Sequence, residues 1–245
     1  MVDNYSQQSN FIYKERLNAN FTFLLKRVGP TVPKTSFFVD IHARLRTIEN
    51  PEALTKIGFW HEGATSWIGD SSWKVNAAFS KTASSVISQA YHKQWNLNMT
   101  ILDRQTEDQL GSVRHITLKN ESDHSRHIKL LLHQMPIAQR EGVVFYSPQE
   151  KALIHHSQDS YSLFSVQMPC AQHIQHGAGP LKQNWSDQEG KLFFAPFSAT
   201  SMESVIAASV TIEPRETYKA RASLLTAESL SYLKHSHKKL WPLPF

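Results

Sequence analysis

The sequence predicts an all-β protein, a large antiparallel sandwich of two sheets followed by a short C-terminal helix. Short segments in which apolar and polar residues alternate recur along the chain, with turn-forming residues between them about every 8–12 residues. The segment near the C-terminus changes to a helical spacing. The length of 245 residues suits a single domain, 1–245, because all-β sandwiches often reach this size as one unit.

The N-terminal part contains three strand signals. Residues 1–10 are polar, and we expect a loose arm there. Alternation over 21–25 indicates a first strand, before glycine and proline break the chain. Residues 36–47 show the clearest period of two, which predicts one strand with a buried and a wet face. Residues 56–60 form a short apolar strand.

The middle of the chain repeats this pattern, with one ambiguous segment. Residues 81–95 fit both a helical stripe and a strand, and periodicity alone does not decide between them. Further strands are expected at 98–103, 113–119, 127–133, 142–146, 152–156 and 160–168. Residues 169–189 hold many polar residues with glycine and proline, which predicts a long surface loop with a helical turn near Ser186.

The C-terminal part predicts two closing strands and one helix. Strand character resumes at 191–194. Alternation over 206–212 and 218–224 indicates a pair of strands that are joined at 213–215. Thr226 can cap a helix over 226–241. The residues at helical spacing in this segment are Leu230, Leu233, His237 and Leu240.

Composition excludes several classes of protein. The N-terminus lacks the basic and apolar regions of a signal peptide, and no apolar run approaches the roughly 20 residues of a membrane span. The single cysteine, Cys170, excludes an intramolecular disulfide framework. The net charge of +5 comes from dispersed Lys and Arg, so nucleic acid is not an expected partner. These features together predict a cytoplasmic protein without a membrane partner.

No residue pattern identifies a catalytic or metal site. Among the 13 His, only His173 and His176 lie in an expected loop where both can reach one ion, and zinc takes several ligands at constrained spacing. Cys170 has His173 nearby in sequence, but a lone cysteine is more often a small buried hydrophobe. The nucleophile-elbow, phosphate-loop and dinucleotide motifs are absent. We therefore expect no catalytic residue, metal or cofactor.

The tryptophans are the strongest candidates for ligand contacts. A flat apolar indole suits the CH face of a sugar ring, whereas large aromatic side chains also dominate protein cores. Trp60 and Trp95 lie on expected strands, and we assign them to the core. Trp67, Trp73 and Trp185 lie near turns, where either role is open, and they are the expected carbohydrate-binding residues.

The order of several motifs resembles a known family. Lys56-Ile-Gly-Phe-Trp60 is followed by Ser66-Trp67-Ile68 and then by Trp73. Further segments that continue this order are 97–103, 113–120, 142–148, 151–157 and 160–164. Over roughly residues 36–225, the succession resembles the N-terminal β-sandwich domain of bacterial glucoamylase-like proteins, glycoside hydrolase family 15.

The resemblance implies a supersandwich of the galactose-mutarotase-like type, and it favours a strand over a helix at 84–94. In that family the sandwich precedes an (α/α)6 barrel that carries both catalytic glutamates. The sequence up to Phe245 contains no such barrel, so the resemblance supplies no catalytic residue. The first 35 residues also depart from the family's usual Gly-rich opening.

The function that the resemblance implies is that of a non-catalytic accessory domain. One such role is docking on a separate (α/α)6-barrel protein or on a second copy of the chain. The expected docking face consists of Leu230, Leu233, Leu240 and Trp241. The other role is holding an oligosaccharide through the tryptophans. A stand-alone enzyme of the aldose-epimerase type is the alternative, because related sandwich folds host such enzymes; its chemistry needs a His and a carboxylate in one cleft.

Overall fold

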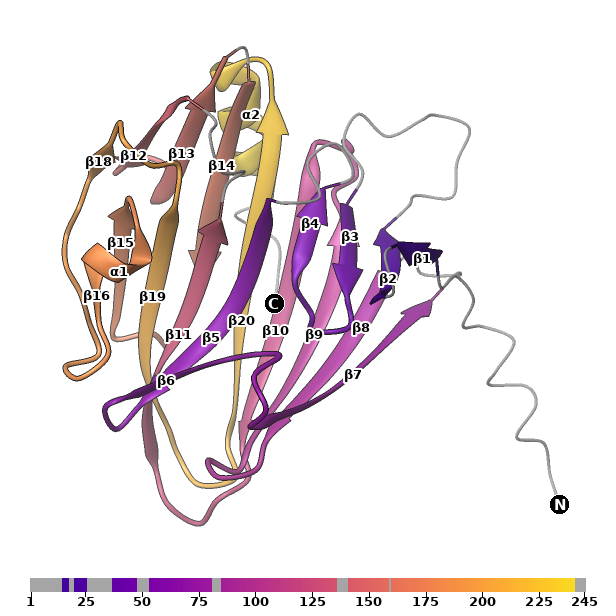
Figure 1. Ribbon diagram of the computed structural model, residues 1–245, viewed down its shortest axis with the longest axis vertical. Helices are drawn as coiled ribbons and strands as arrows, with labels where there is room; N and C mark the ends of the chain where they lie inside the picture. The colour runs from indigo at the N-terminus through magenta and orange to yellow at the C-terminus, as the bar shows by residue number, and fades with distance from the viewer. Residues whose placement is uncertain are drawn as a thin grey trace, which may run out of the picture.

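Two large antiparallel sheets pack against each other and share one hydrophobic core (Figure 1). The computed structural model describes residues 15–17, 20–25, 37–47, 53–80, 85–135, 141–158 and 160–240. Within these ranges each sheet has nine strands, and every strand pair is antiparallel. The predicted two-sheet sandwich is therefore confirmed.

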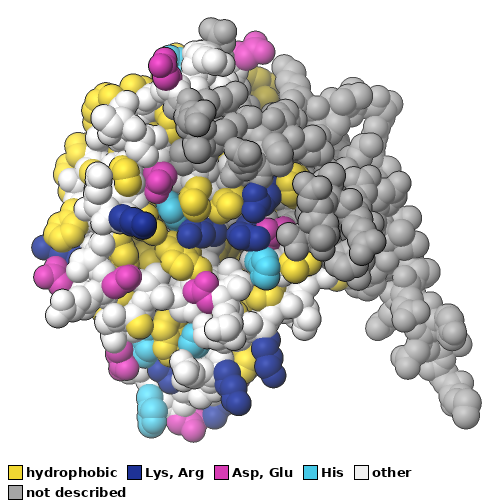
Figure 2. Space-filling model, viewed as in Figure 1, with side chains coloured by type: hydrophobic (Ala, Val, Ile, Leu, Met, Phe, Trp, Pro, Cys, Tyr) yellow, Lys and Arg dark blue, Asp and Glu magenta, His cyan; other side chains and the backbone are white. Residues whose placement is uncertain are grey.

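The first sheet lies in front in Figure 1, and its outer side faces the viewer in Figure 2. Its strands, in spatial order, are β1 (Glu15–Leu17), β2 (Asn20–Leu25), β3 (Phe37–Asp40), β4 (Leu45–Thr47), β5 (Leu54–His61), β11 (Arg126–Met135), β19 (Ser204–Ile212) and β15 (His173–Ala178). A further strand, β6 (Ala64–Trp67), pairs with β5. A short excursion between β15 and β19 contains α1 (Leu181–Asn184), β16 (Trp185–Ser186) and β17 (Lys191–Leu192).

The second sheet lies behind the first. Its strands, in spatial order, are β18 (Phe197–Ser198), β12 (Val143–Ser147), β13 (Ala152–Ser157), β14 (Ser160–Gln167), β20 (Thr217–Ala227), β10 (Gly111–Asn120), β9 (Leu97–Gln105), β8 (Ser85–His92) and β7 (Trp73–Ser80). The helix α2 (Leu230–Leu240) packs against the side of this sheet that faces away from the first. No helix of the described residues is long and apolar enough to cross a membrane.

Alternation along the strands produces the shared core, because successive side chains point to opposite faces of a sheet. In β9, Leu97, Met99 and Ile101 are fully buried between the sheets. The ambiguous segment 81–95 contains the strand β8, which pairs with β7 and β9. The strand that the resemblance favoured at this position is therefore confirmed over Ser85–His92.

The expected single strand over 36–47 is wrong, because the chain turns back on itself and forms the hairpin of β3 and β4. Asp40 explains the reversal. Its Oδ1 accepts hydrogen bonds from the backbone N–H groups of His42 at 2.9 Å and Arg44 at 3.0 Å. Ala43, between them, adopts a left-handed φ of 55°. A side chain that bonds the backbone just ahead of it favours a turn over a continuing strand.

The expected loop over 169–189 contains an edge strand, β15, that the composition did not reveal. Its residues pair with β19 from His173↔Ser209 to Ala178↔Ser204. The strand is bounded by proline and contains glycine, so its pattern resembles that of a loop. The helical turn expected near Ser186 lies slightly earlier, at α1.

The two closing strands do not pair with each other. β19 belongs to the first sheet and β20 to the second, and the turn between them crosses from one sheet to the other. The helix also starts later than expected, because Thr226 is part of β20 and its hydroxyl lies 3.0 Å from that of Ser162. Ser229 precedes α2 instead, and its hydroxyl accepts the N–H of Tyr232 at 3.4 Å.

A buried ion pair connects the two sheets through the core. Arg114 on β10 lies opposite Asp103 on β9, and both side chains point inward. Nε of Arg114 donates to Oδ1 of Asp103 at 2.6 Å, and Nη2 donates to Oδ2 at 3.1 Å. The same Nη2 donates to the carbonyl of Ala43, in the first sheet, at 2.5 Å. Burial raises the pKa of Asp103, while the charge and hydrogen bonds of Arg114 lower it.

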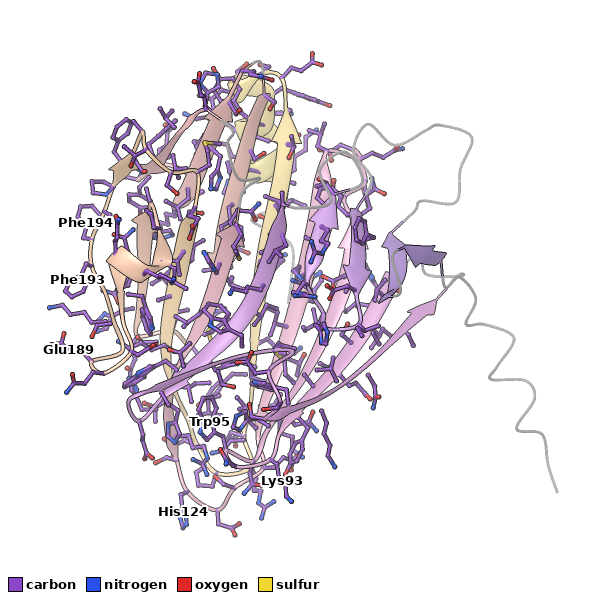
Figure 3. All side chains as sticks on the ribbon, viewed as in Figure 1. Lys93, Trp95, His124, Glu189, Phe193 and Phe194 are labelled. Carbon is purple, nitrogen blue, oxygen red and sulfur yellow. The ribbon has the colours of Figure 1, made fainter. Side chains whose placement is uncertain are left out.

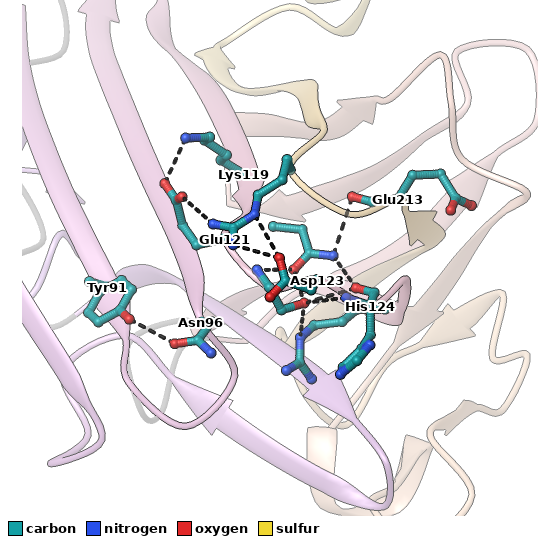
Figure 4. Close-up of polar contacts among 11 residues, drawn as sticks. Tyr91, Asn96, Lys119, Glu121, Asp123, His124 and Glu213 are labelled. Carbon is teal, nitrogen blue, oxygen red and sulfur yellow. Dashed lines mark hydrogen bonds and ion pairs between the residues drawn. The ribbon is translucent and has the colours of Figure 1, made fainter.

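Asn120 bonds to the backbone at the end of the sandwich that contains His124. Figure 3 and Figure 4 label His124 at this end. Its Nδ2 donates to the carbonyls of His124 at 2.7 Å and Ile212 at 3.0 Å. Its Oδ1 accepts the N–H of Ser122 at 3.0 Å. The turns after β10 and after β19 both cross between the sheets, so this one side chain ties the two crossings together.

At one border of the sandwich, residues 195–198 join the edges of both sheets. The carbonyl of Ala195 accepts the N–H of Ala178, on β15, at 2.7 Å. The carbonyl of Pro196 accepts the N–H of Tyr146, on β12, at 2.8 Å. The next two residues, β18, pair with β12. One short segment therefore continues both sheets at this border.

We expect Arg114→Met alone to lower the free energy of unfolding by about 3–5 kcal/mol, because it leaves a buried carboxylate without its partner. The double variant Asp103→Leu/Arg114→Met removes both charges, and we expect it to be more stable than the single variant. Urea denaturation at constant pH measures both values. The exposed pair Arg215–Asp123 provides the control, since Arg215→Met is expected to change stability by less than about 1 kcal/mol. A double variant no more stable than Arg114→Met contradicts the prediction.

We expect stability to fall as the pH falls from about 6.5 to about 4, in part through His155. Burial lowers the pKa of His155 to about 4, and its Nε2 lies 2.9 Å from the Ser204 hydroxyl of the other sheet. The folded state keeps this imidazole neutral while the unfolded chain takes up a proton, so its contribution is present above the unfolded pKa and is lost below it. The expected loss is about 3 kcal/mol.

Urea denaturation at several pH values between 7 and 4 measures this dependence. His155→Leu should reduce the slope of the unfolding free energy against pH by the equivalent of about one bound proton. His124→Gln, at an exposed position, is the control and should leave this slope unchanged. Equal slopes for His155→Leu and the unmodified protein contradict the assignment to His155.

Candidate functional site

Three tryptophans gather on the outer side of the first sheet. In β5, Ile57 and Phe59 point into the core, so Lys56, Gly58 and Trp60 point outward. Trp67 on β6 lies opposite Gly58, and Trp185 follows α1. The name tryptophan face is used below for Trp60, Trp67 and Trp185 with their neighbours Lys56 and Lys129.

Trp67 lies on the backbone of the sheet because Gly58 has no side chain. A Cβ atom at Gly58 would lie only 2.5 Å from Cε3 of Trp67, so no larger residue fits beneath this ring. The ammonium group of Lys56 lies 4.3 Å from the centre of the indole, within the range of a cation–π interaction. Burial lowers the pKa of Lys56, and the charge of Asp70 offsets this in part.

His133 and Glu203 lie beside Trp67. The imidazole ring of His133 is centred 5.7 Å from the indole, and its Nε2 lies 3.1 Å from Oε2 of Glu203. The same carboxylate oxygen accepts the N–H of Leu181 at 3.1 Å. Burial lowers the pKa of His133, and the hydrogen bond from His133 lowers the pKa of Glu203. At neutral pH a neutral His133 therefore donates to an ionised Glu203, and the pair fixes α1 to the sheet.

Trp60 and Trp185 attach the excursion between β15 and β19 to the same face. Nε1 of Trp60 donates to the carbonyl of Asp187 at 2.6 Å. Nε1 of Trp185 lies 2.8 Å from the Asp187 carboxylate and 3.0 Å from the Thr65 hydroxyl. Gly190 packs against Trp60 so closely that a Cβ atom there would lie 2.3 Å from the ring. The indoles thus complete a small second core, whose buried members are Leu131, Leu192, Val205 and Ala207.

This face combines hydrogen-bond donors, an acceptor and aromatic surface, which is the mixture that a hydroxyl-rich ligand uses. Lys56 offers donors, the partly exposed Glu203 offers an acceptor through its place beside His133, and Trp67 offers the part of its ring that Gly58 and Lys56 leave uncovered. Figure 2 shows Lys and Arg side chains in a row across this side, next to hydrophobic side chains. Among the described residues, no group of three or more His, Cys, Asp and Glu is placed to hold a metal ion.

The structure separates the three expected carbohydrate-binding residues. Trp67 and Trp185 come together, and both are half-buried at the surface. Trp73 is only 6% exposed, lies in the main core and donates its Nε1 to the Ser66 hydroxyl at 2.9 Å. Its ring is therefore not accessible to a ligand. The sequence placed Trp73 near a turn, but it is the first residue of β7, and its side chain points into the core.

The two tryptophans assigned to the core lie in different places. Trp95 packs partly buried against the main core near one end of the sandwich, where its ring stacks 4.0 Å from that of His92 (Figure 3). Trp60 is not in the main core; it lies on the tryptophan face, because its position in β5 points outward.

The expected docking face on α2 packs against the protein's own second sheet. Leu233 is fully buried, and Leu230 and Leu240 pack partly buried against the same cluster. His237 also joins this contact, with Nε2 3.1 Å from the Ser165 hydroxyl. Leu233 is therefore not exposed to a partner, and Trp241 lies outside the described residues.

The sequence did not identify Lys56, His133 or Glu203 as members of this site. Lys56 and His133 face each other because β5 pairs with β11, and this register becomes visible only in the folded chain. A partial signal was present, since each residue is a polar position next to one inward-facing apolar residue, Ile57 for Lys56 and Leu132 for His133. Glu203 precedes β19, and nothing in its local sequence marks it.

Comparisons with known proteins identify a fold but no family. No protein-family model matches the sequence, and no curated protein does. Among solved structures, a bacterial glucoamylase complexed with acarbose is similar over 87% of this chain and 33% of that chain, with a TM-score of 0.63 and 11% identity. A putative kojibiose phosphorylase from the human microbiome is similar over 84% of this chain and 28% of that chain, with a TM-score of 0.48 and 10% identity. A GH36 α-galactosidase from Geobacillus stearothermophilus is similar over 84% of this chain and 40% of that chain, with a TM-score of 0.40 and 8% identity.

The glucoamylase shows that this sandwich fold occurs within a longer chain. The present chain spans about a third of the length of that protein. At 11% identity the likeness concerns the fold alone. The phosphorylase and the α-galactosidase have lower TM-scores, and we draw no conclusion from their similarity.

We expect Gly58→Ala to push Trp67 off the sheet and to lower the free energy of unfolding by about 1–3 kcal/mol, because the added methyl group overpacks the contact. The indole N–H resonance of Trp67 in an NMR spectrum should shift, while that of Trp73 should not. In a Trp67→Ala background the conflict is gone, so Gly58→Ala should cause no further loss. An equal loss in both backgrounds contradicts the proposed contact.

Proposed function

We propose that the chain is a non-catalytic β-sandwich domain that binds an oligosaccharide on the tryptophan face. The observation that carries this proposal is the placement of a half-buried Trp67 beside Lys56 and His133, with Glu203 bonded to that histidine. The fold likeness to a glucoamylase supports the carbohydrate class without deciding the role of any residue.

The proposed ligand class follows from the mixture of groups at this face. Every sugar hydroxyl both donates and accepts hydrogen bonds, so a sugar site needs donors and acceptors within reach of one ring. Lys56 is a donor only, whereas the Glu203 carboxylate is an acceptor only. The apolar face of an indole complements the CH groups of the sugar. Trp185, with Asp187 bonded to it, extends the same surface.

Sugar binding is preferred here to helix-mediated docking. Of the apolar residues of α2 expected to meet a partner, Leu233 is fully buried against the second sheet, and Leu230 and Leu240 are half-buried there, so packing within the chain already engages this face. We also propose that the chain is related to glycoside hydrolase family 15 and acts as an accessory domain beside an (α/α)6 barrel. The support for this is that the similar part of the glucoamylase is a third of that protein.

A stand-alone enzyme of the aldose-epimerase type is less well supported. His133 and Glu203 form a His–carboxylate pair, which such chemistry needs. However, His133 is buried, and the carboxylate oxygen that it bonds also holds the N–H of Leu181. The pair is thus engaged in holding α1, and a substrate would have to displace it.

Isothermal titration with maltooligosaccharides tests the proposal. We expect measurable heat at millimolar ligand, and at least a tenfold weaker affinity, about 1.4 kcal/mol, for Trp67→Ala. Trp185→Ala should also weaken binding, because it removes part of the same surface. Phe194→Ala is the matched control. Phe194 is 73% exposed, is labelled in Figure 3 and lies outside the tryptophan face.

Two outcomes contradict the proposal. The first is the absence of heat with every oligosaccharide at millimolar concentration, which removes α-glucans as ligands. The second is an equal loss of affinity in Trp67→Ala and Phe194→Ala, which places the ligand elsewhere.

A further inference from the structure

A cavity of about 550 Å³ opens between the two sheets at the border near β15. The name edge cavity is used for it below. Its walls come from β12, the turn after β12, the end of β14 and β15, so both sheets contribute. This volume lies within the range of about 300–1,000 Å³ that is typical of small-molecule sites. The edge cavity is separate from the tryptophan face, which lies on the outer side of the first sheet.

The floor of the edge cavity is apolar and reaches the main core. Val166 and Met168 line it and are only 3% and 4% exposed. Ile174, on the edge strand β15, adds a half-buried apolar wall. Water bound against such a surface finds few hydrogen-bond partners, whereas an apolar ligand gains burial.

One wall is aromatic and is made by two rings that pack against each other at a tilt. Tyr146 from the second sheet and His176 from the first lie 4.5 Å apart, with an angle of 32° between their rings. Burial lowers the pKa of His176 to about 4, and its hydrogen bond to the backbone of Lys151 raises the pKa in part. His176 is therefore uncharged at neutral pH. An aromatic ligand can pack against these rings, and the sulfur of Met168 adds a polarizable contact.

A single charge marks the cavity. Of the described residues that line it, Lys151 is the one with a charged side chain, and none of them carries a carboxylate. Lys151 is exposed and lies in the turn after β12, where its φ is 48°. Gln167, which also lines the cavity, has its side-chain oxygen engaged by Arg221 at 2.9 Å. The electrostatics at the edge cavity therefore favour an anion over a cation.

We propose that the edge cavity binds a small aromatic carboxylate, with its ring between Tyr146 and Met168 and its carboxylate directed to Lys151. The apolar floor and the aromatic wall favour an aromatic ring over a polar group. The positive charge of Lys151 favours a carboxylate on that ring. The proposal concerns binding alone, with no covalent step.

A pair of probes with matched bodies and opposite charges tests this proposal. We expect 4-methylbenzoate to give saturation-transfer NMR signals and a measurable heat of binding with the full chain. We expect 4-methylbenzylamine to bind at least tenfold more weakly, because its ammonium group faces Lys151.

Two substitutions place the probe in the edge cavity. Ile174→Trp adds bulk to the half-buried wall and should abolish binding of 4-methylbenzoate. Lys151→Glu should reverse the preference, so that the amine binds more tightly than the acid. Because Lys151 is exposed, this variant is expected to fold normally. Lys74→Glu is the matched control, since it makes the same change in net charge at an exposed residue of β7 and should leave the preference unchanged.

Three results overturn the proposal. They are the absence of binding by 4-methylbenzoate at millimolar concentration, an unchanged preference in Lys151→Glu, and undiminished binding in a folded Ile174→Trp variant. The oligosaccharide titration gives an independent result, because its variants lie on the tryptophan face.

Discussion

The buried guanidinium of Arg114 is the constraint on which the arrangement of the two sheets depends. A charge in an apolar core needs an opposite charge and hydrogen bonds at close range to offset the loss of water. Asp103 supplies the opposite charge within the second sheet, and the carbonyl of Ala43 supplies an acceptor from the first. That carbonyl is in position because Asp40 holds the β3–β4 turn by its own hydrogen bonds. A chain of local bonds thus sets how the sheets meet.

Further polar contacts between the sheets lie where the chain crosses or ends. Asn120 holds two crossing turns together, and His155 reaches Ser204 of the opposite sheet. Residues 195–198 join the two edge strands at one border. The sandwich is therefore fixed on several sides, and it can present the tryptophan face and the edge cavity on a rigid frame, as precise binding sites require.

Much of the fold was predictable, because strands such as β9, β10 and β20 show the alternation that one buried face imposes. The failures have local causes. Asp40 turns a pattern that is compatible with one long strand into a hairpin, and β15 has the composition of a loop. For the candidate site, Trp67 and Trp185 were predicted from their residue type and their position near turns. Lys56 and His133 were not, because their proximity depends on strand pairing between distant segments.

The segment 195–198 also affects how the protein behaves toward other chains. An unpaired strand edge exposes backbone N–H and C=O groups, which can recruit a strand from another molecule and start aggregation. This segment bonds to β15 and β12 at once, so it occupies part of the edge of each sheet. A substitution that released it, for example at Ser198, whose hydroxyl donates to the carbonyl of Ser201 at 2.9 Å, would free two edges together. We therefore expect these four residues to protect an edge of each sheet from pairing with other chains.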